Sequence, residues 1–285
     1  MQCNPVFKTG ILFITVTMLF FTACKKNNSN PLTDVDDNGG YASDISKMEW
    51  INNDVISIAD AAGNYYNGVY MRTTGTTNTF GDCALVATDT ISVPHTIRVS
   101  FPSYNCLCLD GKNRRGSIII SYNGQYTDSN QIHTITYDNY YINDQQLMGN
   151  VKVTRVDTTV IGDWYYKVKV SDTLVTTPNS LIVWQGNLVR KWLDGYLTGD
   201  RSDNIYSISG GATLTRANGH IFACDIATPL KIAQACDYVE TGVVNVTNTS
   251  VSGVRVLNYS LGTGGCDVDA QLNIGEHVYQ ITLTE

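Results

Sequence analysis

Segments in which apolar and polar residues alternate follow one another along most of this chain, from about Val69 to the C-terminal residues. A period of two is typical of strands that bury one face. Turn signals such as Asn123-Gly124 and Asn218-Gly219 join many of these segments, and no helix of crossover length separates them. Because parallel strands need long crossover connections, the pattern predicts an antiparallel meander. The predicted fold class is all-β, with one extended sheet of about a dozen strands.

The predicted strands agree with the composition, which is rich in Thr, Val and Ile and includes 17 tyrosines. The clearest are Ala84–Thr90, Thr96–Phe101, Ser117–Tyr126, Ile132–Ile142, Asn150–Val156, Trp164–Val175, Ser180–Trp192, Ile205–Arg216, His220–Ala227, Tyr238–Thr247, Val254–Ser260, Ala270–Ile274 and His277–Thr284. The predicted β domain spans residues 64–285.

One stretch before the strands has a different period. Its apolar residues recur at three- and four-residue spacing: Ile45, Met48, Ile51, Val55, Ile58 and Ala62. This pattern predicts one amphipathic helix over residues 44–63, capped by Ser43 or Asp44 and ended by Gly63. The opposite side lacks basic residues, so packing onto the β domain is favoured over binding to a membrane surface.

The N-terminal residues predict export. Lys8 and an apolar core from Ile11 to Ala23 fit a secretory signal peptide, and the core is too short to span a bilayer. Cys24 follows the core directly, so the segment resembles the lipobox of bacterial lipoproteins, although Phe21 stands where that motif usually has Leu. The prediction is a lipoprotein signal peptide over residues 1–23, then a lipidated Cys24 and a disordered tether over residues 24–43. The alternative is an ordinary signal peptide.

Six further cysteines follow Cys24, and an even set in an exported chain favours disulfides. A weak repeat, in which a cysteine precedes two strands and a second cysteine, predicts the pairs Cys83 with Cys106 and Cys236 with Cys266. Cys108 and Cys224 remain, either as a third pair or as two free thiols. No second close pair or nearby histidine accompanies Cys106 and Cys108, so no metal site is predicted.

Three longer motifs carry a family resemblance. They are CLCLDGKNRRGSIIISYNG (Cys106 to Gly124), TITYDNYYIND (Thr134 to Asp144) and GTGGCDVDAQLNIGEHVYQITL (Gly262 to Leu283). Through them the chain resembles a family of uncharacterised β-rich lipoproteins of Gram-negative bacteria, from roughly Ala84 to the end. The resemblance implies a membrane-anchored envelope protein and no particular biochemical activity.

The sequence contains no catalytic signature. The four histidines stand in strand-like contexts without a nucleophile motif, and no spacing fixes a pair of carboxylates for hydrolysis. We therefore predict no catalytic residues, metal or cofactor, although the sequence does not decide the question of enzymatic activity. The residues that could face a ligand are aromatic: Tyr140, Tyr141, Trp164, Tyr166, Trp184 and Trp192.

Charge limits the choice of partners. The net charge is −7 and no basic run exceeds a pair such as Arg114-Arg115, so nucleic acid is not an expected partner. We interpret that arginine pair as a solvated hairpin tip. The expected role is a non-enzymatic, lipid-anchored protein of the outer membrane, on its periplasmic or cell-surface face, with a structural or binding surface for envelope proteins or glycans. The alternative is a glycan-binding module or a glycan-active hydrolase.

Overall fold

The computed structural model describes residues 39–66, 81–157, 164–178, 180–195, 201–261 and 265–284. The predicted signal peptide, Cys24 and most of the tether lie outside the described residues. One long helix, α1 (Gly40–Tyr66), precedes the strands. Two short 3-10 helices, η2 (Gly81–Cys83) and η3 (Arg201–Asp203), also occur. Among the described segments, no helix combines the length and apolar character that crossing a bilayer requires.

The described strands form one antiparallel sheet that is not closed, with β1 and β14 at its two edges. Consecutive strands pair with each other, with one exception. Strand β2 pairs with β4 and not with β3, and β3 pairs only with β4. The strands are β1 (Leu85–Asp89), β2 (His95–Ser100), β3 (Cys106–Leu107), β4 (Asn113–Tyr122), β5 (Ile132–Ile142), β6 (Gln145–Asp157), β7 (Trp164–Thr177), β8 (Ser180–Asp194), β9 (Ile205–Arg216), β10 (Ile221–Ala233), β11 (Thr241–Asn248), β12 (Val254–Asn258), β13 (Asp269–Ile274) and β14 (His277–Thr282). The predicted all-β meander is therefore confirmed, and only the two-residue strand β3 was not foreseen.

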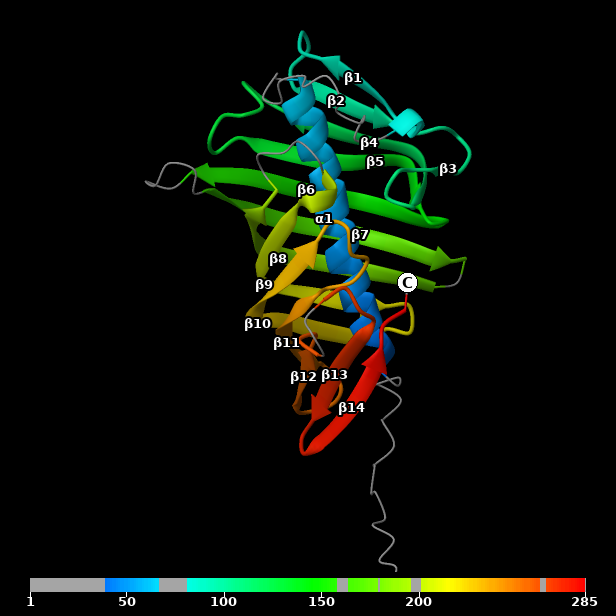
Figure 1. The fold of residues 1–285 in the computed structure, drawn as a ribbon, viewed down its shortest axis with the longest axis vertical. Helices are drawn as coiled ribbons and strands as arrows, with labels where there is room; N and C mark the ends of the chain where they lie inside the picture. The colour runs from blue at the N-terminus through cyan, green and yellow to red at the C-terminus, as the bar shows by residue number, and fades with distance from the viewer. Residues whose placement is uncertain are drawn as a thin grey trace, which may run out of the picture. The chain divides into compact units, whose positions relative to one another are not determined.

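Helix α1 lies across the strands of this sheet, and Figure 1 shows the strand direction turning between β6 and β14 along it. The twist of a β-sheet gives it a curved face on which a helix can pack. All six residues of the predicted apolar stripe are at most 3% exposed. The polar residues between them are buried as well, including Asn53, Asp54 and Ser57. Protein thus surrounds α1 on all sides, which an amphipathic pattern does not predict.

Both predicted disulfides are present. Cys83 is bonded to Cys106 and Cys236 to Cys266, so each closes a segment of the meander, as the sequence repeat predicts. Cys108 and Cys224 are free and buried. Of the two alternatives for this pair, the structure therefore has the free thiols.

The helix extends beyond Gly63, its predicted end, to Tyr66. Gly63 lies inside α1, and the ring of Tyr126 packs directly on it. A side chain at this position would overlap that ring, which explains why the residue is glycine. The Tyr126 hydroxyl donates a hydrogen bond to the Ala59 carbonyl at 3.0 Å. The glycine therefore makes room for a sheet residue and does not end the helix.

We predict that Gly63→Ala destabilises the fold, although alanine is the better helix former. On an open helix surface this change stabilises by up to about 1 kcal/mol, whereas overpacking costs about 1–3 kcal/mol. Urea unfolding should show a lower free energy of unfolding for Gly63→Ala than for the wild type. In a Tyr126→Ala background, which removes the ring, the same substitution should be neutral or stabilising. An equal loss in both backgrounds would contradict this account of Gly63.

Candidate functional site

Three of the aromatic residues predicted to face a ligand lie in the core. Tyr140 and Trp184 are 0% exposed and Tyr166 is 8% exposed. They point to the face of the sheet that α1 covers, because alternate strand residues share one face. The prediction that these three present rings to a ligand is wrong.

Of the other three, the two whose side chains are described, Tyr141 and Trp192, are partly buried. Trp192 is half-buried and its indole N–H donates to Asn204 Oδ1 at 3.2 Å. The ring of Tyr141 lies under the Arg115 guanidinium, 3.8 Å from its central carbon. The side chain of Trp164 lies outside the described residues. Burial in the core, or contact with an arginine or another ring, accounts for the five rings that are described.

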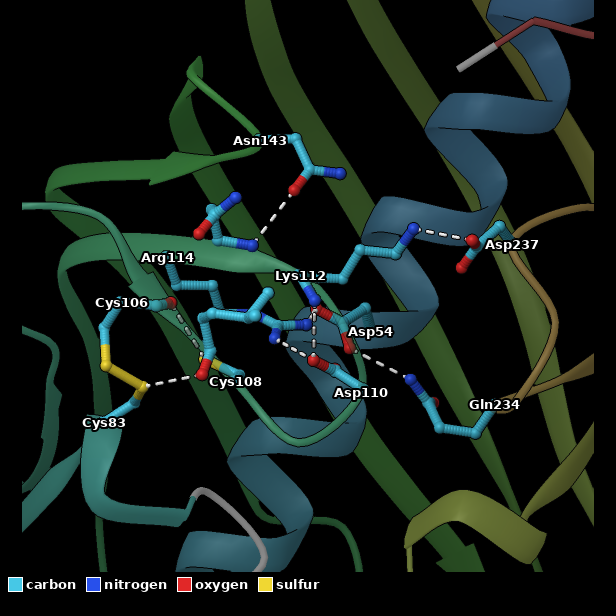
Figure 2. A network of polar contacts seen from close by, with 12 residues as sticks. Asp54, Cys83, Cys106, Cys108, Asp110, Lys112, Arg114, Asn143, Gln234 and Asp237 are labelled. Carbon is cyan, nitrogen blue, oxygen red and sulfur yellow. Dashed lines mark hydrogen bonds and ion pairs between the residues drawn. A yellow bond between two sulfur atoms is a disulfide. The ribbon is translucent and has the colours of Figure 1, made fainter.

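Arg114, interpreted from the sequence as part of a solvated hairpin tip, is only 2% exposed. Its guanidinium donates to Asp54 Oδ2 of α1 at 2.8 Å and to Asp110 Oδ1 at 2.7 Å. Gln234, beyond β10, donates to the other Asp54 oxygen at 2.9 Å, and Figure 2 shows these residues converging on α1. Burial disfavours the charged guanidinium, yet with Asp54 beside it the pKa of Arg114 stays well above its usual value. The interpretation of Arg114 as part of a solvated hairpin tip is therefore wrong, because its side chain points from β4 toward α1.

Two further arginines of the sheet meet carboxylates of α1. Arg190 of β8 is 1% exposed and donates to Asp60 Oδ2 at 3.0 Å and to Asn53 Oδ1 at 2.9 Å. Its guanidinium also lies 3.7 Å from the ring centre of Tyr206.

Arg216 of β9 pairs with Asp44 near the start of the helix at 2.9 Å. We call the pairs Asp44–Arg216, Asp54–Arg114 and Asp60–Arg190 the helix–sheet ion pairs. They join α1 to β4 and to the neighbouring strands β8 and β9.

Glu49 is a fourth carboxylate of α1 and is 3% exposed. Burial raises its pKa from 4.5 to about 8. On the sheet, burial raises the pKa of Asp172 from 3.8 to about 7, against a lowering contribution from the hydroxyl of Tyr137, which donates to it at 2.9 Å. Both acids therefore favour their neutral form in the folded protein at mildly acidic pH.

A pocket of about 40 Å³ is formed beside Arg114 and its partners. It brings together α1, the β3–β4 turn, the β5–β6 turn, the loop after β10 and the residue Thr284 after β14. Lys112 Nζ lies 2.6 Å from Asp237 Oδ2 and 5.1 Å from the ring centre of Trp50, and Figure 2 shows Lys112 extending toward Asp237. This pocket is the candidate binding site.

Sequence reasoning did not find the pocket. Its residues come from five segments whose meeting depends on the complete sheet. One local signal was present: Trp50 lies in the helical stretch but outside the predicted apolar stripe, on a side that is otherwise polar. A large aromatic residue at such a position needs a partner of its own.

The described residues contain no group of three or more His, Cys, Asp or Glu side chains placed to hold a metal ion. His133 stacks on Tyr126 with ring centres 4.1 Å apart, and burial lowers its pKa. His95, His220 and His277 lie at or beside strand ends.

We predict that Arg114→Met lowers the free energy of unfolding by about 3–5 kcal/mol, because it leaves the Asp54 carboxylate buried without its cation. The neighbouring Arg115 is a matched control. Its side chain is 24% exposed and pairs with Asp144, which is 70% exposed, so Arg115→Met should cost less than about 1 kcal/mol. Urea unfolding of both variants checks this, and equal losses would show that the Arg114 pair has no special role.

A second prediction concerns pH. Between pH 4.5 and about 8 the folded protein holds the Glu49 proton that the unfolded chain releases, so stability should fall as pH rises through this window. Glu49→Gln should flatten part of this decline and raise the melting temperature at pH 8 more than at pH 5. Asp172 contributes in the same direction up to about pH 7, so some slope remains.

Thermal unfolding across this pH range measures the effect of Glu49→Gln. Glu276→Gln, on the exposed turn between β13 and β14, is the control. If Glu49→Gln and Glu276→Gln change the pH profile equally, the buried acid is not the cause of the decline.

Comparisons with protein-family models, with known proteins and with solved structures found no match for this chain. The resemblance to β-rich lipoproteins of Gram-negative bacteria therefore stays a prediction.

Proposed function

We propose that this chain is a non-enzymatic, lipid-anchored protein of the bacterial cell envelope whose antiparallel sheet supports a binding site. The anchor is the lipid on Cys24, in the outer membrane and on either its periplasmic or its outer face. Envelope proteins or glycans are the partners. Two or more acyl chains hold a protein on a membrane almost permanently, so such a protein acts where it is anchored.

The observation that carries this proposal is the position of α1, which follows the predicted tether and lies inside the core of the β domain. Near its start, Ser43 Oγ accepts a hydrogen bond from the Thr284 amide at 3.1 Å. Near its end, the Ala59 carbonyl accepts one from Tyr126 at 3.0 Å. A pull on the tether therefore acts on the whole sheet. This suits a protein that must stay folded while it is attached to a membrane.

The geometry of the pocket favours binding over hydrolysis. Hydrolysis of a glycosidic bond uses two carboxyl groups that flank the bond. Asp237 is the only carboxylate among the described residues that line the pocket, and Lys112 pairs with it at 2.6 Å. Of the two alternatives left open by the sequence, a glycan-binding module is the one that the pocket supports.

We predict that Cys24→Ser abolishes lipid labelling and moves the protein from the membrane fraction to the soluble fraction of lysed cells. Cys3→Ser is the matched control, because Cys3 lies within the predicted signal peptide and is removed with it. Metabolic labelling with an alkyne fatty acid, followed by fractionation, measures both effects. Unchanged labelling and membrane retention in Cys24→Ser would refute the anchor.

Protease treatment of intact cells then distinguishes the two faces of the outer membrane. Digestion of the wild-type chain on intact cells places the sheet at the cell surface. Protection until the outer membrane is opened places it in the periplasm.

A further inference from the structure

Three cysteines lie together at the short strand β3, next to the 3-10 helix η2. Cys83 is bonded to Cys106, and Cys108, two residues after Cys106, is a free thiol that is 8% exposed. Alternate residues of an extended chain point to the same side, so Cys106 and Cys108 share one side of this segment. Leu107 between them is 67% exposed and points the other way. The free thiol therefore lies on the same side of the chain as the disulfide.

The sulfur atoms of this group contact neighbouring peptide groups, and Figure 2 shows the three cysteines side by side. Cys83 Sγ lies 3.3 Å from the Leu107 carbonyl oxygen, and Cys108 Sγ lies 3.6 Å from the Cys106 carbonyl oxygen. A carbonyl oxygen is about 2.8 Å from the Cα of the next residue, so Cys83 Sγ lies within about 6 Å of the Cys108 Cα. This distance brings a disulfide between Cys83 and Cys108 within reach of side-chain rotation and a small backbone shift.

The second disulfide, Cys236–Cys266, has no such neighbour among the described residues. The other free thiol is Cys224, in the middle of β10. The part of β10 from Cys224 to Ala233 spans about 30 Å, and Cys236 is only three residues beyond it. Cys224 is therefore remote from Cys236, and the group at β3 differs from the second disulfide in its third sulfur.

We propose that Cys83, Cys106 and Cys108 form a thiol–disulfide exchange site. The Cys108 thiolate attacks Cys83 Sγ, the Cys83–Cys108 bond forms, the Cys83–Cys106 bond breaks and Cys106 leaves as a thiolate. Cys108 gives up one proton and Cys106 takes one up, so the step needs no oxidant or reductant.

The effect of this exchange is to move the free thiol from a buried position to Cys106, which is partly exposed. There the thiolate can attack the disulfide of a small molecule or of another envelope protein. That reaction forms one mixed disulfide and releases one thiol. The inference goes beyond the proposed binding role and does not depend on the lipid at Cys24.

The surroundings of Cys108 determine how readily its thiolate forms. The charged or titratable groups around it are Arg114 of β4, Asp110 before that strand, Asp54 of α1 and Tyr140 of β5. Burial raises the pKa of the Cys108 thiol, and the Arg114 guanidinium opposes this rise because it stabilises the thiolate. We therefore expect exchange to be slow at neutral pH and to accelerate toward alkaline pH.

A variant without Cys106 tests whether Cys83 reaches Cys108. The whole Cys106→Ser chain is equilibrated with glutathione and its disulfide, blocked with N-ethylmaleimide and mapped as peptides without reduction. Cys83 should be bonded to Cys108 in most chains. Cys266→Ser is the matched control, because Cys236 then has no third cysteine within reach and should remain free or carry glutathione.

Labelling of the folded wild-type chain tests the exchange itself. The protein is held with N-ethylmaleimide at about pH 8, and fragmentation of the peptide that contains both Cys106 and Cys108 identifies the modified residue. The label should appear on Cys106, together with a Cys83–Cys108 disulfide, at least about tenfold faster than on the buried Cys224. Cys108→Ser should abolish labelling of Cys106, because it removes the attacking thiol.

Two results would overturn the exchange site. One is a folded Cys106→Ser chain in which Cys83 and Cys108 do not pair. The other is a wild-type chain that is labelled only on Cys108, or not at all, and keeps the bond from Cys83 to Cys106. If Cys106→Ser does not fold, the wild-type labelling decides alone. Neither result bears on the membrane anchor, which the Cys24→Ser fractionation tests separately.

Discussion

A buried carboxylate of α1 that stays charged needs compensation inside the protein, because an unpaired charge away from water is very costly. Asp54 and Asp60 obtain it from Arg114 and Arg190, which stand on β4 and β8. These partners are separated by 60 and 130 positions in the sequence, so neither pair can form until helix and sheet come together. The register of α1 on the sheet depends on these contacts.

Apolar burial and ion pairing have different roles in this arrangement. The apolar stripe of α1 supplies the favourable free energy, since burying such side chains stabilises by about 1.5–3 kcal/mol each. A buried ion pair often gains little over apolar residues of the same size, but losing one partner is expensive. We therefore interpret the helix–sheet ion pairs as fixing where α1 lies. The same placement brings Trp50 beside the β5–β6 turn and so forms the candidate pocket.

Much of the fold could be predicted from the sequence, because strand alternation and turns are local signals. The strands Ile132–Ile142 and Ile205–Arg216 were predicted with the bounds that the structure has, and the repeat identified both disulfides. The site could not be predicted, because Arg114 looks like a turn residue until its distant partner Asp54 is known. Gly63 was misread for the same reason, since only the ring of Tyr126 explains it.

Hydrogen exchange of the backbone amides tests most directly the claim that α1 is an integral part of the β domain. We predict that the amides from Ile45 to Ala62 exchange only by global unfolding, at the same free energy as those of the central strands β7 and β8. Exchange of the α1 amides orders of magnitude faster than those of β7 and β8 would contradict it, because the helix would then open while the sheet stays folded.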